Sequence, residues 1–397
     1  MVVSHYEALT NIYLPPNIRH EFHTKGHIIM GMTPRERIMA VLNGEEPDRI
    51  PVCVVNLLLP ELPGGWCQRL AKRGMGIFRW VLLYKPGWSP DAPGVFSGHA
   101  YLKDVKYTQV YYIEKGIKKY RHTFETPVGS ITGVVAVNPL PHMPLVLAQE
   151  EYLVKQPSDW RVVNFIFKTR LDNLAPDYEA IKIAEDELGD AGIAVGFSEQ
   201  TAWQKAWTHL APLERAVIDF HEQPEEVQEF IETEKRLHTR IAEFVAECPA
   251  KFIDIGENIT DVTSPKYYRA YCLPIYEIYS KQLEGTGKVL GVHMDGRLGR
   301  LKKEIAETLI NLIESFAVPP TGEVSLTEVR KIWPDKMIIM NTACHLAWAE
   351  PEEVRKGYEA LLEEWGSKKG LILELSEHLP LETVEAHLSA AMDVFGY

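Results

Sequence analysis

Short apolar runs alternate with amphipathic stretches along the second half of the chain. The runs have the length and composition of buried strands, and they cover residues 192–197, 251–256, 288–293, 310–316, 336–341 and 371–375. A helical stretch follows each of them, for example over residues 351–365. Strands that alternate with helices in this way predict parallel βαβ units.

The number of these units decides between two α/β architectures. A further apolar run, Ile50–Leu59, brings the number of strands to seven, and we expect an eighth within residues 75–115. Seven or eight units favour a (β/α)8 TIM barrel over an open doubly wound sheet. The open sheet is also disfavoured because no Gly-x-Gly-x-x-Gly motif follows any of these strands.

A helix start signal precedes the first strand. Thr33 stands at the N-cap position, Pro34 at the first helical position and Glu36 at the capping-box position. The helix should run over Arg35–Leu42 and end at the Asn-Gly pair that follows. We therefore expect the barrel to begin near residue 33.

The N-terminal third contains a segment of a different kind. Residues 103–137 alternate β-branched and aromatic residues with polar ones, and turn signals interrupt them. This pattern predicts an antiparallel β excursion from the barrel. We expect a lead-in over residues 1–30, a long irregular connection over 60–100, and one barrel domain over 33–397.

Composition narrows the class of protein. The 397 residues include 42 Lys and Arg against 55 Asp and Glu, so the formal net charge is 42 − 55 = −13, which argues against nucleic acid as a partner. No secretory signal opens the chain, and no apolar stretch approaches the length of about 18 residues that spans a membrane. The five scattered cysteines include no Cys-x-x-Cys pair. We expect a cytoplasmic protein with free thiols.

Polar residues recur where the predicted strands end. In a (β/α)8 barrel the chemistry lies just past the C-terminal ends of the strands. These positions hold Glu199 and Gln200; Asp254, Glu257 and Asn258; His293 and Asp295; Asn341, Cys344 and His345; and Glu377 and His378, while Glu314 lies within a strand. We predict that Glu199, Asp254, Asn258 and His345 are catalytic residues.

One imidazole and two carboxylates from this set form a candidate metal site. His293, Asp295 and Glu377 could close three positions around a divalent ion, with Zn²⁺ favoured, and leave one position for a substrate. The alternative is a polar pocket without metal. In that case His293-Met294-Asp295-Gly296 would cap a helix, and Glu377 would pair with an arginine such as Arg297.

Two parts of the chain resemble a known family. Met32–Val52 reads MTPRERIMAVLNGEEPDRIPV, and the tail contains PEEVRKGYEALLEEWG followed by LILELSEHLPLETVEAHLSAAMDVFGY. Both parts resemble the uroporphyrinogen decarboxylase superfamily, and the resemblance extends over most of residues 190–397. It implies a (β/α)8 barrel with one of two activities. These are decarboxylation in the haem pathway and zinc-dependent methyl transfer with corrinoid proteins.

The residues depart from the decarboxylase pattern. In those enzymes the first strand leads into a segment whose arginines hold the substrate carboxylates, but Val54–Leu59 contains no arginine. The methyltransferases bind zinc through His-x-Cys and a later cysteine. Here His293 matches directly, while Asp295 and Glu377 replace the thiolates. The resemblance therefore implies a metal-dependent methyltransferase with a corrinoid protein as partner and a small methylated compound or a thiol as substrate. A homodimer is compatible with it.

Two other classes of function stay open. The first is a decarboxylase or lyase for a smaller acid, with Asp254, Glu199 or His293 as acid–base groups and no need for a metal. The second is a non-catalytic barrel that binds a tetrapyrrole or a corrinoid. Metal analysis of the purified protein would separate the methyltransferase from both.

Overall fold

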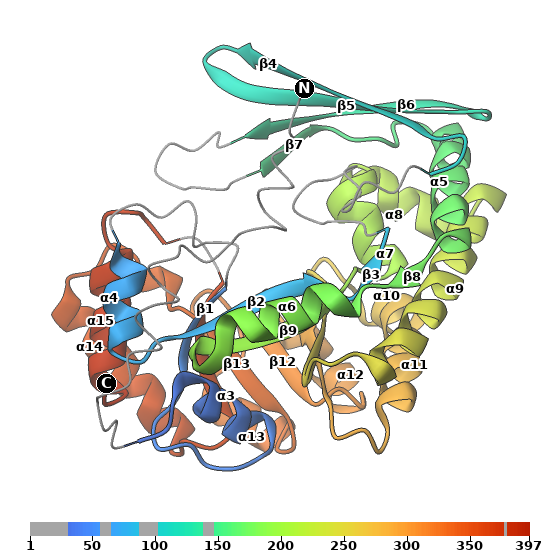
Figure 1. The fold of residues 1–397 in the computed structure, drawn as a ribbon. Coiled ribbons are helices and arrows are strands. Elements are labelled where there is room, and N and C mark those ends of the chain that lie inside the picture. Colours follow the sequence, from blue (N-terminus) through green and yellow to red (C-terminus); the bar gives the residue numbers. More distant parts are fainter. Residues whose placement is uncertain (1–30, 56–64, 87–101, 138–146, 377–378) are drawn as a thin grey trace.

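Eight parallel strands close into a barrel in the order β1-β14-β13-β12-β11-β10-β9-β2 (Figure 1). The computed structural model describes residues 31–55, 65–86, 102–137, 147–376 and 379–397. The barrel strands are β1 Val52–Val55, β2 Gly76–Leu82, β9 Gly192–Ser198, β10 Phe252–Ile255, β11 Val289–His293, β12 Leu312–Phe316, β13 Met337–Asn341 and β14 Leu371–Leu375. The predicted TIM barrel is confirmed, and β2 is the eighth strand expected within residues 75–115. The predicted lead-in over residues 1–30 lies outside the described residues.

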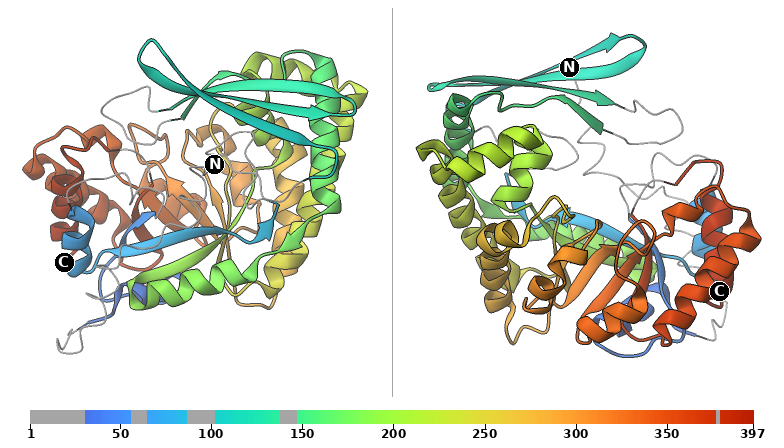
Figure 2. Two further views of the ribbon diagram at one scale, coloured as in Figure 1. Left: turned by 45° about the horizontal axis from the view of Figure 1, so that its top comes forward. Right: turned by 180° about the vertical axis from the view of Figure 1, so that it is seen from behind.

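Helices surround the barrel (Figures 1 and 2). The described ones are α3 Pro34–Leu42, α4 Trp66–Lys72, α5 Trp160–Asp172, α6 Tyr178–Leu188, α7 Ala202–Lys205, α8 Leu213–Glu222, α9 Glu225–Glu247, α10 Pro265–Tyr267, α11 Leu273–Leu283, α12 Lys302–Ala306, α13 Leu326–Ile332, α14 Pro351–Trp365 and α15 Val384–Val394. None of these helices has both the length and the apolar character that crossing a bilayer requires.

Local signals explain where two of these helices begin and end. The side chain of Thr33 accepts a hydrogen bond from the backbone of Glu36, and the Glu36 side chain accepts one from the backbone of Thr33, so the predicted capping box of α3 is present. Helix α14 ends at Gly366, whose φ of 66° lies in the left-handed region that glycine adopts without strain.

The antiparallel excursion is present between β2 and β9. Strands β4 Lys106–Glu114, β5 Ile117–Thr126, β6 Gly129–Val137 and β7 Leu147–Glu151 form a four-stranded sheet in that order, which confirms the prediction. The sheet lies at one end of the molecule and packs against α5 (Figure 1). The short strands β3 Tyr84–Lys85 and β8 Ala175–Pro176 pair separately.

The barrel strands are buried on both faces. Every residue of β9, β12 and β14 is buried, as expected when helices cover the outside and side chains fill the inside. Because an ionised group is costly to bury without a partner, any acidic residue in these strands requires an explanation.

Candidate active site

Three barrel strands carry one acidic residue each in an otherwise apolar sequence. Asp254 lies in β10, Glu314 in β12 and Glu374 in β14, and all three are fully buried. These strands alternate around the barrel, and alternate strands supply the inward side chains of one layer. The negative charge of Glu314 raises the pKa of both Asp254 and Glu374, as expected for carboxyls that converge inside the barrel.

His293 joins this cluster from the end of β11. Its Nδ1 is hydrogen-bonded to Oε2 of Glu314 on the neighbouring strand, and its Nε2 lies 3.7 Å from Oδ2 of Asp295. Burial alone would lower the pKa of His293, but the carboxylates of Glu314 and then Asp295 raise it, and the balance lies well above the ordinary value. The imidazole is therefore held between two carboxylates.

The backbone beside Glu314 adopts an unusual conformation. The pairing of β12 with β13 shifts between Ile313 and Phe316, and Ser315 has a φ of 58° in the left-handed region. The Ser315 hydroxyl forms a hydrogen bond of 2.6 Å with the hydroxyl of Ser376, which follows β14. A bulge with a left-handed serine costs free energy, and such features gather where a side chain must be aimed at a site.

Asp254 and Glu374 favour their protonated forms. Burial raises the pKa of each carboxyl well above its ordinary value, and the nearby charge of Glu314 raises it further. Neither oxygen of Asp254 has a hydrogen-bond partner among the described residues. Burial and the nearby negative charge thus both favour a proton on these two carboxyls.

An aromatic wall borders His293. Trp80 of β2 stacks on Phe197 with ring centroids 5.1 Å apart, and it meets the His293 ring edge-on at 6.1 Å. Apolar rings beside an ionisable cluster keep water away and strengthen the electrostatic interactions within it.

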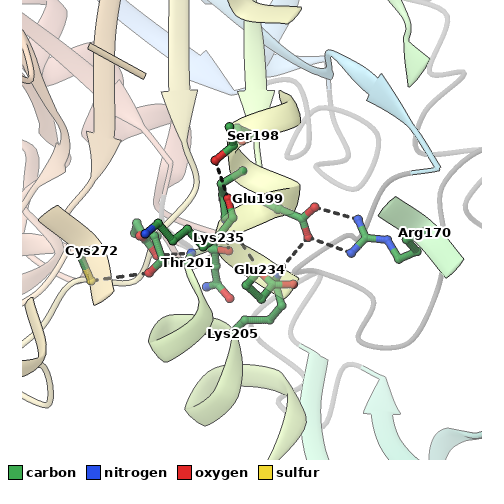
Figure 3. Close-up of polar contacts among 12 residues, drawn as sticks. Arg170, Ser198, Glu199, Thr201, Lys205, Glu234, Lys235 and Cys272 are labelled. Carbon is green, nitrogen blue, oxygen red and sulfur yellow. Dashed lines mark hydrogen bonds and ion pairs between the residues drawn. The ribbon is translucent and has the colours of Figure 1, made fainter. Parts of the chain in front are cut away.

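Glu199 lies in a separate buried network (Figure 3). Its carboxylate accepts hydrogen bonds from Arg170 of α5 at 2.7 Å, from Lys205 of α7 at 2.7 Å and from the Tyr84 hydroxyl at 3.0 Å. Lys205 also pairs with Glu234 of α9. Burial would raise the pKa of Glu199, but Arg170 and Lys205 lower it well below the ordinary value. The Glu199 carboxylate therefore connects α5 and α7 to the end of β9. Because three donors hold it in its ionised form, it cannot accept a proton until one of them moves away.

Asn258 connects the ends of two adjacent strands. Its Oδ1 accepts a hydrogen bond of 3.1 Å from Nε2 of Gln200, which follows β9. The neighbouring Glu257 accepts hydrogen bonds from the Thr201 backbone and from the Tyr276 hydroxyl, each at 3.1 Å. These contacts fix the loops after β9 and β10 relative to each other.

The other predicted site residues have different surroundings. His345 is exposed in the turn Cys344–Leu346 after β13. Glu377 lies outside the described residues, so the structure brings together two of the three predicted metal ligands, His293 and Asp295. Within the described ranges no group of three or more His, Cys, Asp and Glu side chains is placed to hold a metal ion.

The surroundings of His293 and Asp295 nevertheless fit a metal. Oδ1 of Asp295 is buried without a hydrogen-bond partner among the described residues, and Oδ2 lies on the Nε2 side of the imidazole. A metal-binding histidine commonly gives its other ring nitrogen to a carboxylate, as Nδ1 of His293 does to Glu314. An imidazole with a carboxylate is a donor set that zinc and other divalent ions accept.

Residues just past the strand ends do not include Glu374, and the sequence pattern assigns no role to Glu314. Each lies inside a strand rather than after it, in the sequences LIESF and LILEL. A single acid within a short apolar run was the available signal, and the sequence FIDI around Asp254 shows it as well.

Comparison with known proteins places the chain in a family. The sequence profile described as uroporphyrinogen decarboxylase (URO-D) matches residues 149–396. A methyltransferase from Methanosarcina mazei has a similar fold, with a TM-score of 0.53 and 12% sequence identity over 92% of this chain and 100% of that chain. A B12-independent methionine synthase from Shewanella sp. W3-18-1 aligns with a TM-score of 0.35 and 10% identity over 74% of this chain and 75% of that chain. The search of curated proteins found no match. Because the profile spans more than half of its residues, the chain belongs to the uroporphyrinogen decarboxylase family.

Proposed function

We propose that the protein is a metal-dependent methyltransferase that works with a corrinoid protein. The observation that carries the proposal is the placement of His293, with Nδ1 on Glu314 and Nε2 toward Asp295 at the end of a barrel strand. The fold it shares with a methyltransferase from Methanosarcina mazei supports the reaction class. His293, Asp295 and Glu377 would hold the metal, with zinc favoured by the donor set.

Each group of the site has a part in this reaction. A bound divalent ion would act as a Lewis acid on the heteroatom of a methoxy compound or a thiol. Glu314 orients the imidazole of His293 through Nδ1. Asp254 and Glu374 favour their protonated forms, and a protonated carboxyl can protonate a leaving alkoxide. Trp80 limits the access of water to His293.

Transfer of methyl from a methoxy compound balances with these groups. A reduced corrinoid, when bound, would supply the nucleophile that accepts the methyl group, and the bond between the methyl carbon and the substrate oxygen would break. The oxygen keeps the electron pair of the broken bond and takes a proton from a carboxyl of the cluster. The corrinoid would be presented by the partner protein at the mouth of the barrel.

A lyase remains the alternative, and a specific observation favours it. Protonated carboxyls such as Asp254 and Glu374 could deliver a proton to the carbanion left after loss of carbon dioxide. Such a reaction needs no metal, so metal dependence distinguishes the two functions.

Metal content and methyl transfer test the proposal together. Purified protein should contain or bind one divalent ion per chain, and His293→Ala should abolish both binding and methyl transfer while the fold is retained. His221→Ala, on the exposed part of α8, is the matched control and should keep both. Transfer can be followed spectroscopically with free cob(I)alamin and a methoxyarene, or with methylcobalamin and a thiol. Wild-type protein that binds no metal and transfers no methyl group in either direction would overturn the proposal.

A further inference from the structure

Strand β4 is a long, exposed edge of the antiparallel sheet. It pairs with β5 on one side, and no other described strand pairs with its outer side. Three of its apolar side chains reach solvent, with Val110 54% exposed, Tyr111 37% and Ile113 76%. In Figure 1 β4 lies on the side of the sheet away from the barrel, where a partner could approach.

Most of the usual protection of an edge strand is missing from β4, whose charged residues, Lys106 and Glu114, stand only at its two ends. Proteins block such edges with prolines, bulges, short strands or charged side chains along the strand. The nine residues of β4 include no proline, and their pairing with β5 is uninterrupted from Lys106 to Glu114. The opposite edge, β7, has five residues, ends in Glu150 and Glu151, and pairs irregularly with β6. Of the two edges of this sheet, only β4 is suited to accept another strand.

The turn that ends β4 determines which backbone groups face outward. Lys115 and Gly116 have φ values of 50° and 81°, as a two-residue type I′ turn requires, and Glu114 lies opposite Ile117. Such a turn has a hydrogen bond between its first and last residues, so Glu114 directs its peptide groups toward β5. The backbone N–H and C=O groups of successive residues in a strand point alternately to its two sides. The odd-numbered residues of β4, from Tyr107 to Ile113, therefore direct their N–H and C=O groups to the free edge.

We propose that β4 pairs in antiparallel fashion with β4 of a second copy of this chain, about a twofold axis at Val110. In this register all nine residues find a partner. Tyr107 lies opposite Ile113 and Gln109 opposite Tyr111, and these odd-numbered pairs exchange the outward backbone hydrogen bonds. Val110 of one copy lies opposite Val110 of the other. The pairing removes exposed apolar side chains of both copies from water.

The charges at the two ends of β4 are complementary in the same register. Lys106 lies opposite Glu114 of the second copy, and both belong to even-numbered pairs without backbone hydrogen bonds, where side chains lie closest. Lys106 already pairs with Glu125, and Glu114 with Lys119. The contact between copies therefore joins these two ion pairs. The result is a row of alternating charge that runs from Glu125 and Lys106 of one copy to Glu114 and Lys119 of the other. A register centred on Gln109 would instead place Asp104 opposite Glu114, with like charges facing each other.

Charge reversal gives a test that separates this pairing from other causes of association. Sedimentation velocity of the full chain should show a dimer at concentrations up to about 100 µM, where a dimer with a Kd of about 1 µM is well populated. Lys106→Glu and Glu114→Lys, each alone, should weaken the dimer at least about tenfold, which is about 1.4 kcal/mol. An equal mixture of the two variants should restore it, because every facing pair is then opposite in charge. Lys103→Glu, an exposed reversal outside β4, is the control and should change little.

A proline substitution provides an independent measurement. The N–H of Gln109 faces the free edge, so Gln109→Pro should abolish the dimer while the β4–β5 hairpin and the circular dichroism spectrum are retained. Wild-type protein that stays monomeric would overturn the proposal. So would a dimer that withstands Gln109→Pro, or single charge variants whose association is not restored by mixing.

Discussion

The imidazole of His293 and the carboxylate of Glu314 lie opposite each other on neighbouring barrel strands, and a hydrogen bond joins Nδ1 to Oε2. Glu314 is fully buried, and Oε1 has no partner among the described residues. A buried carboxylate with one strong partner has a large effect on that partner, because little water screens it. Glu314 therefore controls both the orientation of His293 and its affinity for protons.

Glu314→Gln should lower the pKa of His293. The amide oxygen still accepts a hydrogen bond from Nδ1, but the negative charge that favours the imidazolium is gone, so the pKa should fall toward its ordinary value of about 6.5. The measurement is an NMR titration of the histidine ring protons in chelator-treated protein. Glu323→Gln, an exposed change of the same kind, should leave this pKa as it is. An unchanged His293 in Glu314→Gln would contradict the role given to Glu314.

Glu199→Gln should destabilise the protein strongly. The substitution leaves Arg170 and Lys205 buried without their shared counter-charge, and breaking a buried pair costs about 3–5 kcal/mol. Urea denaturation measures the loss. Glu352→Gln removes an exposed ion pair with Lys356 and should cost less than about 1 kcal/mol. A Glu199→Gln protein with wild-type stability and no activity would instead support the catalytic role that its position after a strand predicts.

Local signals account for the parts of the fold that the sequence predicts well. The capping box at Thr33 depends on residues only three positions apart, and the helix Pro351–Trp365 depends on the pattern within its own residues. The apolar runs of the barrel strands are short and distinct. Helix α5, Trp160–Asp172, was not predicted, because it mixes apolar, aromatic and charged residues. The helical structure of α5 is stabilised by packing against α9 and the antiparallel sheet, and no local sequence pattern reveals these contacts.

The site was predictable to the extent that it follows the strand ends. His293 and Asp295 could be found by that rule, whereas Asp254, which was selected with them, lies inside β10 as Glu314 and Glu374 lie inside their strands. The same rule selected Glu199. Its partner Arg170 comes from α5, 29 residues earlier in the chain, and its partner Lys205 comes from α7. Tertiary packing directs both side chains inward, and no local pattern reveals this. The ligand role of Glu377 stays a prediction.

The protein should not decarboxylate uroporphyrinogen. The substrate carries several carboxylates that need cationic partners, and three arginines near the start of the barrel are engaged elsewhere. Arg69 pairs with Glu385, Arg73 with Asp393 and Arg79 with Glu187. Anaerobic assays with the reduced substrate test this expectation. Turnover near the enzyme median of about 10 per second would show that other groups hold the carboxylates.

His122 should make the antiparallel sheet sensitive to acid. It is fully buried in β5 between Tyr120 and Phe124, and neither ring nitrogen has a hydrogen-bond partner among the described residues. Burial lowers its pKa from 6.5 to about 4. Between these values the unfolded chain binds a proton that the folded chain does not. The stability contributed by neutral His122 is therefore complete above pH 6.5 and is lost as the pH falls toward 4.

His122→Leu should remove this dependence. The difference in unfolding free energy between variant and wild type should shift in favour of the variant by about 2–3 kcal/mol between pH 7.5 and pH 4.5, since each unit of pKa shift corresponds to about 1.36 kcal/mol. Urea denaturation at the two pH values gives the difference directly. Phe124→Leu, a buried substitution in the same strand without a titrating group, should lower stability by the same amount at both. If the difference for His122→Leu is also the same at both pH values, the histidine is protonated in the folded sheet or is reached by water, and burial does not control its charge.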